Sequence, residues 1–368
     1  MKKGKRLSYL IILIVFMLGF IAVTVVTPAL ADGQSKEEEL IVGCIFASPI
    51  GDMGWTYSHD LGRQYLEETL PYVKTIVEEN VAPPDASAVA DIMIMEGAKV
   101  VIFNDINYQD VAMAKGEQYP DKYFVYCAGP EIAHNVASIF SAIYEPTYLT
   151  GILAGALSKT GKIGFVAAMP LPQVLRRINA MAIGAREINP DAKIQVIYTN
   201  NWYDPPTEMD VSNTLISLGC DVIAQHQNSP ASVQAASKKG VYSIGFHSDM
   251  RKFSPKLHVT APIWTWGAIY VRIVEAYAKG EPLENVSIWG TMSDGSVDIS
   301  PINPAVSIPS DILKLVEQRR AELKEGKFDP FHGPCKDVNG EIIVKEGEHL
   351  SYQALREMNW YAEGVIVP

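Results

Sequence analysis

The stretch that decides the fold is LIVGCIFA, residues 40–47, followed by the loop IGDMGW at residues 50–55. Eight uncharged residues that end at a glycine-containing loop predict a buried strand. The amphipathic segment at 57–68 then predicts a helix, and this alternation continues to a strand expected at 123–128. Short apolar runs that alternate with helices are typical of a parallel sheet covered on both faces. The chain is therefore expected to be an α/β protein.

A second series of the same kind begins near residue 147. It contains apolar runs that predict strands, again separated by helical segments, and these runs lie at 162–167, 194–199, 222–225 and 241–245. Two successive series of similar length in a chain of 368 residues predict two α/β lobes, each with a doubly wound parallel sheet of its own.

The expected domain boundaries follow from these two series. We expect a leader, a short polar tether, the first lobe, the second lobe, a return to the first lobe, and a final segment with a third crossover, the rest of the second lobe and a C-terminal extension. The corresponding ranges are 1–31, 32–39, 40–145, 146–262, 263–286 and 287–368. In the last range, Asn339-Gly340 between two short runs predicts a β-hairpin. The segment from Tyr352 to Val365 predicts a short amphipathic helix.

The composition is that of a globular protein, with 48% hydrophobic and 20% charged residues. The formal net charge is −11, and the first six residues carry four cations and no acid, so the remainder is more acidic still. Nucleic-acid-binding proteins need clustered Lys and Arg. The charge therefore argues against nucleic acid and against a strongly anionic ligand. A neutral or cationic ligand is expected.

The first 31 residues have the three parts of an export signal. A basic start precedes an apolar run from Tyr9 to Val26, and Ala29 and Ala31 occupy the −3 and −1 positions of a cleavage site. The alternative is a retained membrane anchor, because 18 apolar residues approach the length of a membrane span. With either, the body of the protein is expected on the periplasmic or extracellular face of the membrane.

Motifs for catalysis, cofactors and metals are missing from the sequence. No G-x-G-x-x-G follows a strand, and neither G-x-S-x-G nor H-E-x-x-H occurs. The seven histidines never stand three or four residues apart, and His226 and His247, which end strands at the expected cleft, favour a hydrogen-bonding or structural role. The four cysteines form no Cys-x-x-Cys pair and favour buried thiols, although export permits disulfides. We expect a protein without enzymatic activity, metal or cofactor.

Ligands of open parallel sheets bind at the carboxyl ends of the strands, so the loops after the expected strands form the candidate site. Four of the six tryptophans fall in these loops. A single tryptophan there most often covers a core, but four that face one cleft would form flat walls suited to a planar ring or a cation. Polar side chains of the same loops would then bind the edge of the ring. The candidate ligand-binding residues are Asp52, Trp55, Asn104, Trp202, Asn228, Asp249 and Trp264.

The order of several short motifs is similar to that of the BMP (basic membrane protein) family, the purine-nucleoside-receptor-like solute-binding proteins of ABC transporters. The resemblance extends from about Glu39 to the C-terminus and rests on the number and order of the motifs. They are GDMGW (51–55), YLTGILAG (148–155), KTGKIGFV (159–166), GAREINP (184–190), GCDVIA (219–224) and GFHSD (245–249).

This resemblance implies the type I periplasmic binding protein fold, in which two lobes joined by three crossover strands close on a ligand. It also implies that an aromatic side chain of the first loop stacks on the base, and Trp55 stands at that place. A second stacking aromatic is matched by Trp202. The acidic first loop of the family, often with two Asp, is matched by Asp52 alone. The implied partners are the permease subunits of an ABC importer, and we expect a monomer.

Two departures from the family pattern concern the sugar. Nucleoside binders usually have a G-x-D-x-D-Q-like run whose first Asp grips the ribose, whereas this chain has GFHSDM (245–250) and keeps only the later acid, Asp249. A family Lys near the last crossover is replaced by the segment from Trp264 to Trp266. The resemblance therefore implies a free purine base, with adenine preferred. The alternatives are a sensor or receptor for a purine nucleoside, a flavin or a furanose signal, and a nucleoside hydrolase acting through Asp52 or Asp249.

Overall fold

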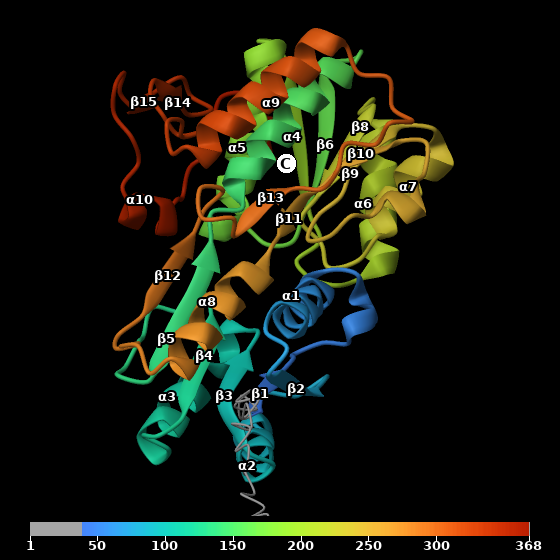
Figure 1. The fold of residues 1–368 in the computed structure, drawn as a ribbon. Coiled ribbons are helices and arrows are strands. Elements are labelled where there is room, and N and C mark those ends of the chain that lie inside the picture. Colours follow the sequence, from blue (N-terminus) through green and yellow to red (C-terminus); the bar gives the residue numbers. More distant parts are fainter. Residues whose placement is uncertain (1–38, 368) are drawn as a thin grey trace, which may run out of the picture. The chain divides into compact units, whose positions relative to one another are not determined.

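The structure of the protein, a computed structural model, describes residues 39–367. The expected leader, and the tether up to residue 38, lie outside the described residues. Within 39–367 the chain forms two lobes that each contain a parallel sheet (Figure 1), which confirms the expected fold class. None of the helices in this range combines the length and the apolar character needed to cross a bilayer.

The first lobe contains a six-stranded sheet in which every pair of neighbouring strands is parallel. The strand order is β12-β5-β4-β3-β1-β2. The strands are β1 (Leu40–Ile45), β2 (Val73–Glu78), β3 (Ala98–Phe103), β4 (Tyr123–Cys127), β5 (Val136–Ser141) and β12 (Ser287–Gly290). The helices are α1 (Trp55–Thr69), α2 (Ala86–Met95), α3 (Gln109–Gln118) and α8 (Trp266–Ala278), with short turns η1 (Ile50–Asp52) and η2 (Ile106–Tyr108).

Alternate residues of the central strands enter two different cores. Val42 and Cys44 of β1 pack in one cluster with Leu66 of α1, whereas Ile45 packs in a second cluster with Ala90 of α2. Successive strand side chains point to opposite faces of a sheet, so this division means that both faces are covered. Helices α1 and α8 cover one face, and α2 and α3 cover the other.

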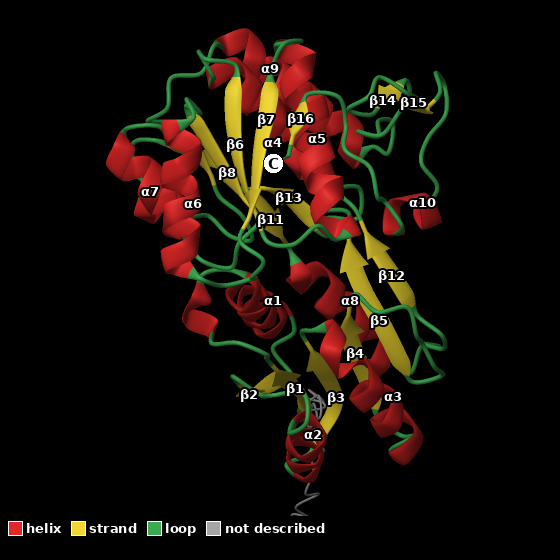
Figure 2. Ribbon diagram, turned by 180° about the vertical axis from the view of Figure 1, so that it is seen from behind, coloured by secondary structure: helices red, strands yellow, loops and turns green. Residues whose placement is uncertain are grey.

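The second lobe repeats this design with a six-stranded parallel sheet in the order β10-β9-β8-β6-β7-β16. Its strands are β6 (Lys162–Ala167), β7 (Lys193–Tyr198), β8 (Val222–Gln225), β9 (Tyr242–Ile244), β10 (His258–Thr260) and β16 (Val365–Ile366). Its helices are α4 (Tyr144–Leu157), α5 (Pro172–Ile188), α6 (Pro205–Ser217), α7 (Ala231–Lys239) and α9 (Ser310–Lys324), with the turn η3 (Arg251–Phe253). Figure 2 shows α6 and α7 on one side of this sheet.

Helices α4 and α5 pack with their backbones in close contact. A Cβ atom on Gly184 of α5 would lie 2.2 Å from the carbonyl oxygen of Tyr148, and one on Gly155 of α4 would lie 2.4 Å from that of Ala185. Both distances are far shorter than van der Waals contact, so only glycine permits this approach. The pair forms the side of the second lobe that α9 covers.

The chain passes between the lobes three times, which agrees with the three crossovers implied by the family resemblance. The first passage leads from β5 into α4, the second from β10 through β11 (Pro262–Trp264) to α8, and the third from β12 through β13 (Val297–Ile299) to α9. Strands β11 and β13 pair with each other in an antiparallel ribbon. Figures 1 and 2 both show this ribbon between the two sheets.

Several elements differ from the expectations. Strand β5 was not expected, because it follows β4 without an intervening helix and carries the serines Ser138 and Ser141 within an apolar run. Strand β12 lies in the first sheet, so the return to the first lobe reaches Gly290 and not the expected end at residue 286. Trp264 lies on β11, so the segment expected as a loop is a crossover strand, whereas the helix expected at 266–278 is present as α8.

The C-terminal extension also differs. The expected hairpin is present as β14 (Cys335–Lys336) and β15 (Ile342–Val344). The expected helix over 352–365 stops early, since α10 spans only Tyr352–Arg356 and the chain then runs to β16. Buried Met358, Ala362 and Val365 have helical spacing, which explains the wrong prediction. Their backbone is held instead by Asn179 of α5, which donates to the carbonyl oxygen of Trp360 and accepts from the N–H of Ala362.

Candidate ligand-binding site

A cavity of about 210 Å³ lies where the carboxyl ends of the strands of the two sheets meet. In each sheet the chain reverses its winding direction beside the first strand, between β1 and β3 and between β6 and β8, and such switch points are the usual ligand sites of doubly wound sheets. The residues that line the cavity are Ser48, Trp55, Asp105, Ile106, Asn107, Ala128, Phe140, Ile143, Gln173, Trp202, His226, Asn228, Phe246, His247 and Trp264.

Trp55 is the first residue of α1 and supplies one aromatic wall of the cavity. Its Nε1 donates to the carbonyl oxygen of Asn104 at 2.6 Å, and its ring meets those of His59, Trp264 and Trp266 edge to face, with centroids 4.6, 5.4 and 5.4 Å away. The indole N–H is therefore used within the protein. A ligand contacts Trp55 only through the carbon surface of the ring.

The loop before Trp55 approaches the second lobe closely. A Cβ atom on Gly54 would lie 2.3 Å from the backbone oxygen of Asn228, so glycine is needed where the two loops meet. Next to this contact, Ser248 Oγ donates to the carbonyl oxygen of Met53 at 2.8 Å. The lobes thus touch directly at the edge of the site.

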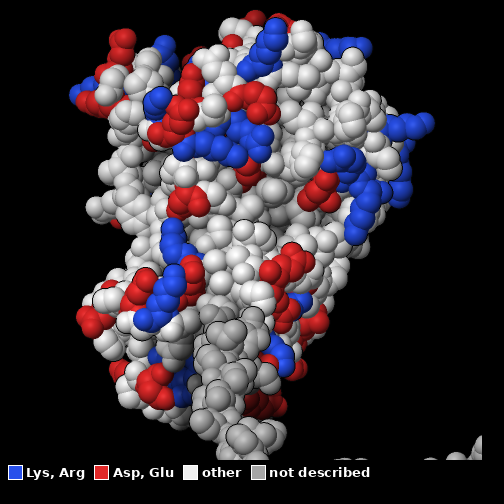
Figure 3. All heavy atoms as spheres, in the orientation of Figure 1, with Lys and Arg blue, Asp and Glu red and all other residues white. Residues whose placement is uncertain are grey.

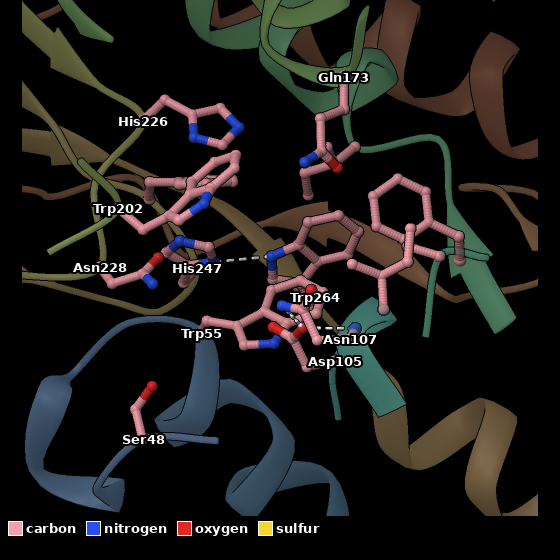
Figure 4. A pocket seen from close by; sticks show the side chains of 15 residues that line it. Ser48, Trp55, Asp105, Asn107, Gln173, Trp202, His226, Asn228, His247 and Trp264 are labelled. Atoms are coloured by element: carbon pink, nitrogen blue, oxygen red, sulfur yellow. Dashed lines mark hydrogen bonds between the residues drawn. The ribbon is translucent and has the colours of Figure 1, made fainter. Parts of the chain in front are cut away.

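Trp202 and Asn228 enter the cavity from the second lobe, and Figure 4 shows them on the side opposite Asp105 and Asn107. They follow β7 and β8, and the carbonyl oxygen of Trp202 accepts from the N–H of Asn228 at 2.9 Å. This bond fixes the two loops against each other. Among the described residues, the side-chain amide of Asn228 has no hydrogen-bond partner, so it is available to a ligand.

Trp264 and His247 form a linked pair on the floor of the site. Trp264 Nε1 donates to His247 Nδ1 at 2.9 Å, and the Trp264 ring stacks on Trp266 with centroids 4.9 Å apart. Trp266 itself is fully buried and donates to Ser58 Oγ at 3.1 Å. Trp266 therefore belongs to the core beneath the site, and the Trp264 ring that packs on it lines the cavity.

Asp52 and Asn104 do not line the cavity but shape the loops around it. Asp52 is buried and accepts from the backbone N–H groups of Gly54, Thr56 and Tyr57, which ties it to the beginning of α1. Burial raises the pKa of this carboxyl to about 6, against the lowering effect of these three bonds. Asn104 is fully buried and accepts from the N–H of Ala47 at 2.9 Å. Both side chains bind backbone N–H groups of the segments around Trp55 and so fix its position.

Asp249 also lies away from the cavity. Its side chain is exposed and pairs with Arg251 at 3.0 Å, beside a separate surface depression that also includes Lys252 and Pro255. The structure thus brings four of the seven candidate residues together in one cavity, namely Trp55, Trp202, Asn228 and Trp264.

Other polar side chains of the cavity were not among the candidates, although they lie in or next to the same loops. Asp105 Oδ1 accepts from both the backbone N–H and the side-chain amide of Asn107, at 2.9 and 2.7 Å, which leaves its Oδ2 free of any partner among the described residues. Burial raises the pKa of Asp105. Gln173, at the start of α5, has an amide without a hydrogen bond among residues 39–367. The signal for Asp105 was its position directly after Asn104 at the end of β3.

The two histidines of the cavity are neutral. Burial lowers the pKa of both imidazoles well below the usual value, and the positive charge of Arg177 adds to this for His226 and His247. Arg177 is fully buried behind the cavity, with its guanidinium 3.4 Å from the centroid of the Phe246 ring. Asp105 is consequently the one charged side chain among the fifteen described residues that line the cavity.

Residues 39–367 contain no group of three or more His, Cys, Asp or Glu side chains that could hold a metal ion. The four cysteines, Cys44, Cys127, Cys220 and Cys335, are buried and unpaired. Burial raises the pKa of each thiol. These thiols pack as small apolar side chains.

Two doubly wound lobes, three passages between them and a cavity with indole walls at their junction define a two-lobed solute-binding protein. The chain belongs to the Bmp family, described as PnrA-like ABC transporter substrate-binding proteins, whose family model matches residues 40–326. The family resemblance noted from the sequence motifs is thereby confirmed. A protein of this class binds a small molecule outside the cytoplasmic membrane and works with membrane permease subunits.

Two relatives agree with this assignment, and a solved structure has the same fold. A purine-binding protein of Brucella abortus is 36% identical over 338 residues, which cover 91% of this chain and 95% of that protein. A putative ABC transporter glucose-binding protein of Haloferax volcanii is 35% identical over 90% of this chain and 82% of its own length. The solved structure of an ABC transporter solute-binding protein from Conexibacter woesei has a TM-score of 0.69 at 20% identity, over 79% of this chain and 98% of that one.

Proposed function

We propose that this protein captures a free purine base, with adenine preferred, and delivers it to the permease of an ABC importer. The observation that carries the proposal is a cavity with indole walls from both lobes, Trp55 and Trp264 on one side and Trp202 on the other. Flat aromatic walls favour a planar ring system, because stacking on both faces uses the whole ring area. The name of the Brucella abortus relative, a purine-binding protein, supports the same ligand class.

The size of the cavity favours a base over a nucleoside. An apolar cavity of about 150 Å³ holds one benzene ring. A cavity of about 210 Å³ is half as large again and suits a fused two-ring base without an attached sugar. Trp264, on the crossover strand β11, lines this cavity, which supports the expectation that a bulky side chain there leaves less space for a sugar.

The electrostatic character of the cavity favours a neutral ligand. The imidazoles of His226 and His247 are uncharged, and the remaining polar groups are amides, a hydroxyl and the Asp105 carboxylate. An amide such as that of Asn228 both donates and accepts, which suits the mixed edge of a purine. Asp105 Oδ2 is an acceptor for an exocyclic amine, which favours an amino-substituted purine such as adenine over one without an amino group.

Ligand binding stabilises the closed arrangement of the lobes. A base held between Trp55 and Trp202 contacts both lobes at once, so its binding energy adds to the direct contacts at Met53 and Gly54 only when the lobes are together. The permease then recognises a closed, loaded protein.

The test is a titration of tryptophan fluorescence with adenine, guanine, adenosine, riboflavin and glucose. We expect adenine to bind most tightly and adenosine more weakly, because ribose adds volume to a ligand that already suits a cavity of about 210 Å³. Mass spectrometry of small molecules released by denaturing the freshly purified protein provides an independent identification. Indifference to every purine in both measurements would remove the proposed ligand.

A second candidate ligand is a sugar, which the name of the Haloferax volcanii relative favours. The amides of Asn228 and Gln173 and the Asp105 carboxylate are groups that bind hydroxyls. Glucose binding with no response to adenine would establish this alternative. The hydrolase alternative has no support in the geometry, because Asp52 and Asp249 do not line the cavity.

A further inference from the structure

His247 combines a strained backbone with a buried polar atom that lacks a partner. Its φ is 69°, in the left-handed region, which is uncommon for a residue other than glycine. A bridge between His247 and Ile263 of β11 holds this part of the backbone in place. Strained residues of this kind gather at functional sites and persist because the surrounding structure holds them.

The hydrogen bond from Trp264 determines which ring nitrogen of His247 carries the proton. An indole N–H is a donor only, so His247 Nδ1, 2.9 Å from Trp264 Nε1, must be the acceptor. A neutral imidazole has one donor and one acceptor nitrogen, and its proton therefore sits on Nε2. The Trp264 indole, stacked on the buried Trp266, keeps the ring in this state.

His247 Nε2 has no hydrogen-bond partner among the described residues, although the side chain is 97% buried and lines the cavity. A buried donor without a partner costs free energy, and proteins rarely retain one unless something else satisfies it. Figure 4 shows the ring among Trp202, Asn228 and Trp264, the side chains that form the cavity's second-lobe wall and floor. A ligand in the cavity is the available partner.

We infer that His247 Nε2–H selects ligands that present a hydrogen-bond acceptor, a ring nitrogen or a carbonyl oxygen, at this point of the cavity. The inference rests on the proposed function and deepens it. The donor cannot reverse its role, because Trp264 occupies the other nitrogen. Ligands that place an N–H, a C–H or a positive charge against Nε2 are rejected, since the donor then stays unpaired.

His226, the other histidine of the cavity, differs from His247 because no hydrogen bond from a described indole fixes its tautomer. Its Nδ1 is also buried without a partner among the described residues. His226 can therefore turn either a donor or an acceptor toward the cavity. Only His247 has its chemistry determined by the fold.

The test uses adenine and its 1-deaza, 3-deaza and 7-deaza analogues, each of which replaces one ring nitrogen by C–H without changing the shape. For the unmodified protein we expect one of the three analogues to bind about 10- to 100-fold more weakly than adenine, because one buried hydrogen bond is lost. His247→Phe should lower the affinity for adenine by a similar factor. The affinity for that analogue should fall little further, because the hydrogen bond that it lacks is already gone. A purely structural role would weaken all four ligands equally.

Two further variants make the result decisive. His247→Asn keeps an acceptor for Trp264 and a donor for the ligand, and Asn tolerates the left-handed backbone, so it should restore part of the discrimination. His258→Phe is the matched control, because His258 is a buried histidine of the same lobe outside the cavity. If His247→Phe does not fold, the analogue series on the unmodified protein and on His247→Asn decides.

The outcomes separate the two proposals. If adenine binds but all three analogues bind equally well, or if the loss persists unchanged in His247→Phe, the role of His247 is refuted and the purine proposal stands. If no purine binds, the proposed function fails and the inference fails with it.

Discussion

Trp55 is positioned by two residues, Asp52 and Asn104, that do not line the cavity. The Asp52 carboxylate holds the beginning of α1, and the carbonyl oxygen of Asn104 accepts the indole N–H. These bonds remove rotational freedom from the ring before a ligand arrives, which lowers the entropy cost of stacking. At the scale of the residue, the site is therefore an apolar surface fixed by polar groups.

Replacement of Trp55 by alanine should weaken adenine binding by about 10- to 100-fold, as expected when one stacking face is lost. Trp202→Ala should have a similar effect, because its ring faces the same cavity from the other lobe. Isothermal titration calorimetry measures both. The control is Tyr203→Ala, an exposed neighbour of Trp202 that does not line the cavity. Equal affinity for Trp55→Ala and the unmodified protein would contradict the stacking role.

The close packing of helices α4 and α5 depends on two glycines that have no Cβ atom. Gly155 and Gly184 let the two backbones touch, and the many buried residues of both helices then form the core of the second lobe. The first turn of α4 also contains Glu145, whose Oε2 accepts from the N–H of Met292 at 2.7 Å, next to the third passage between the lobes.

Gly184→Ala should destabilise the protein by about 1–3 kcal/mol, because the new methyl group would overlap the carbonyl oxygen of Tyr148 and force the helices apart. Chemical denaturation measures the change. Gly51→Ala is the control, since a Cβ atom at Gly51 meets nothing within 4 Å. A loss no greater than that of Gly51→Ala would show that the helices adjust without cost.

The stability should also depend on pH through Glu145. Burial raises the pKa of Glu145 to about 8 from its ordinary value of 4.5. The folded protein therefore keeps this proton to a higher pH than the unfolded chain does. The contribution of Glu145 to the free energy of unfolding is complete below pH 4.5 and is lost as the pH rises through 8. Asp329 and Asp294 act in the same direction.

Glu145→Gln should remove this dependence, because a neutral amide still accepts from Met292 but does not ionise. We expect the variant to be more stable than the unmodified protein above pH 8, by up to about 5 kcal/mol, and similar to it near pH 4.5. Urea denaturation at a series of pH values measures the difference. Parallel curves for the two proteins would contradict the role of Glu145.

At the scale of the whole molecule, the C-terminal extension adds contacts between the lobes beside the three chain passages. Arg176 of α5 donates to the carbonyl oxygen of Leu355, which attaches α10 to the second lobe. Tyr352 of α10 meets Trp289 of the first sheet edge to face at 5.0 Å, and Arg356 reaches the carbonyl oxygen of Ala128, a residue of the cavity wall. Figures 1 and 2 both show α10 near β12.

Loss of these contacts should favour opening of the lobes. We expect the double variant Tyr352→Ala/Arg356→Ala to release ligand about 5- to 30-fold faster, because the aromatic contact and the hydrogen bond each contribute on the order of 0.5–1 kcal/mol to the closed arrangement. Stopped-flow fluorescence measures the release rate. Gln353→Ala is the matched control, since Gln353 is exposed on the same short helix and bonds only to Glu357 among the described residues. An unchanged release rate in the double variant would contradict this role of α10.

The surface charge is also a property of the whole molecule. On the face shown in Figure 3, Lys and Arg are interspersed with Asp and Glu. Much of the basic charge is paired, as for Arg320 and Lys324, both 2.8 Å from Asp298. This face therefore carries charges of both signs and no continuous basic field.

The amino-acid sequence by itself determined the two α/β series, the hairpin at Asn339-Gly340 and the loops that carry Trp55, Trp202 and Asn228. These features depend on the spacing of apolar residues and on turn residues, which are local properties of the chain. The short strands β5 and β16 escaped prediction because a strand of few residues is defined by its neighbours in the sheet.

Only the tertiary structure decided how the polar groups of the site are used. Asp52 and Asn104 bind backbone atoms, Asp249 pairs with Arg251 at the surface, and Trp264 fixes the proton of His247. A polar side chain binds whichever partner the fold brings near. That partner can be a neighbour in the chain, as Arg251 is for Asp249, or lie 57 residues away, as Ala47 does from Asn104. The residue types of a site can therefore be predicted from the chain, whereas the atoms left free for a ligand depend on the folded neighbours.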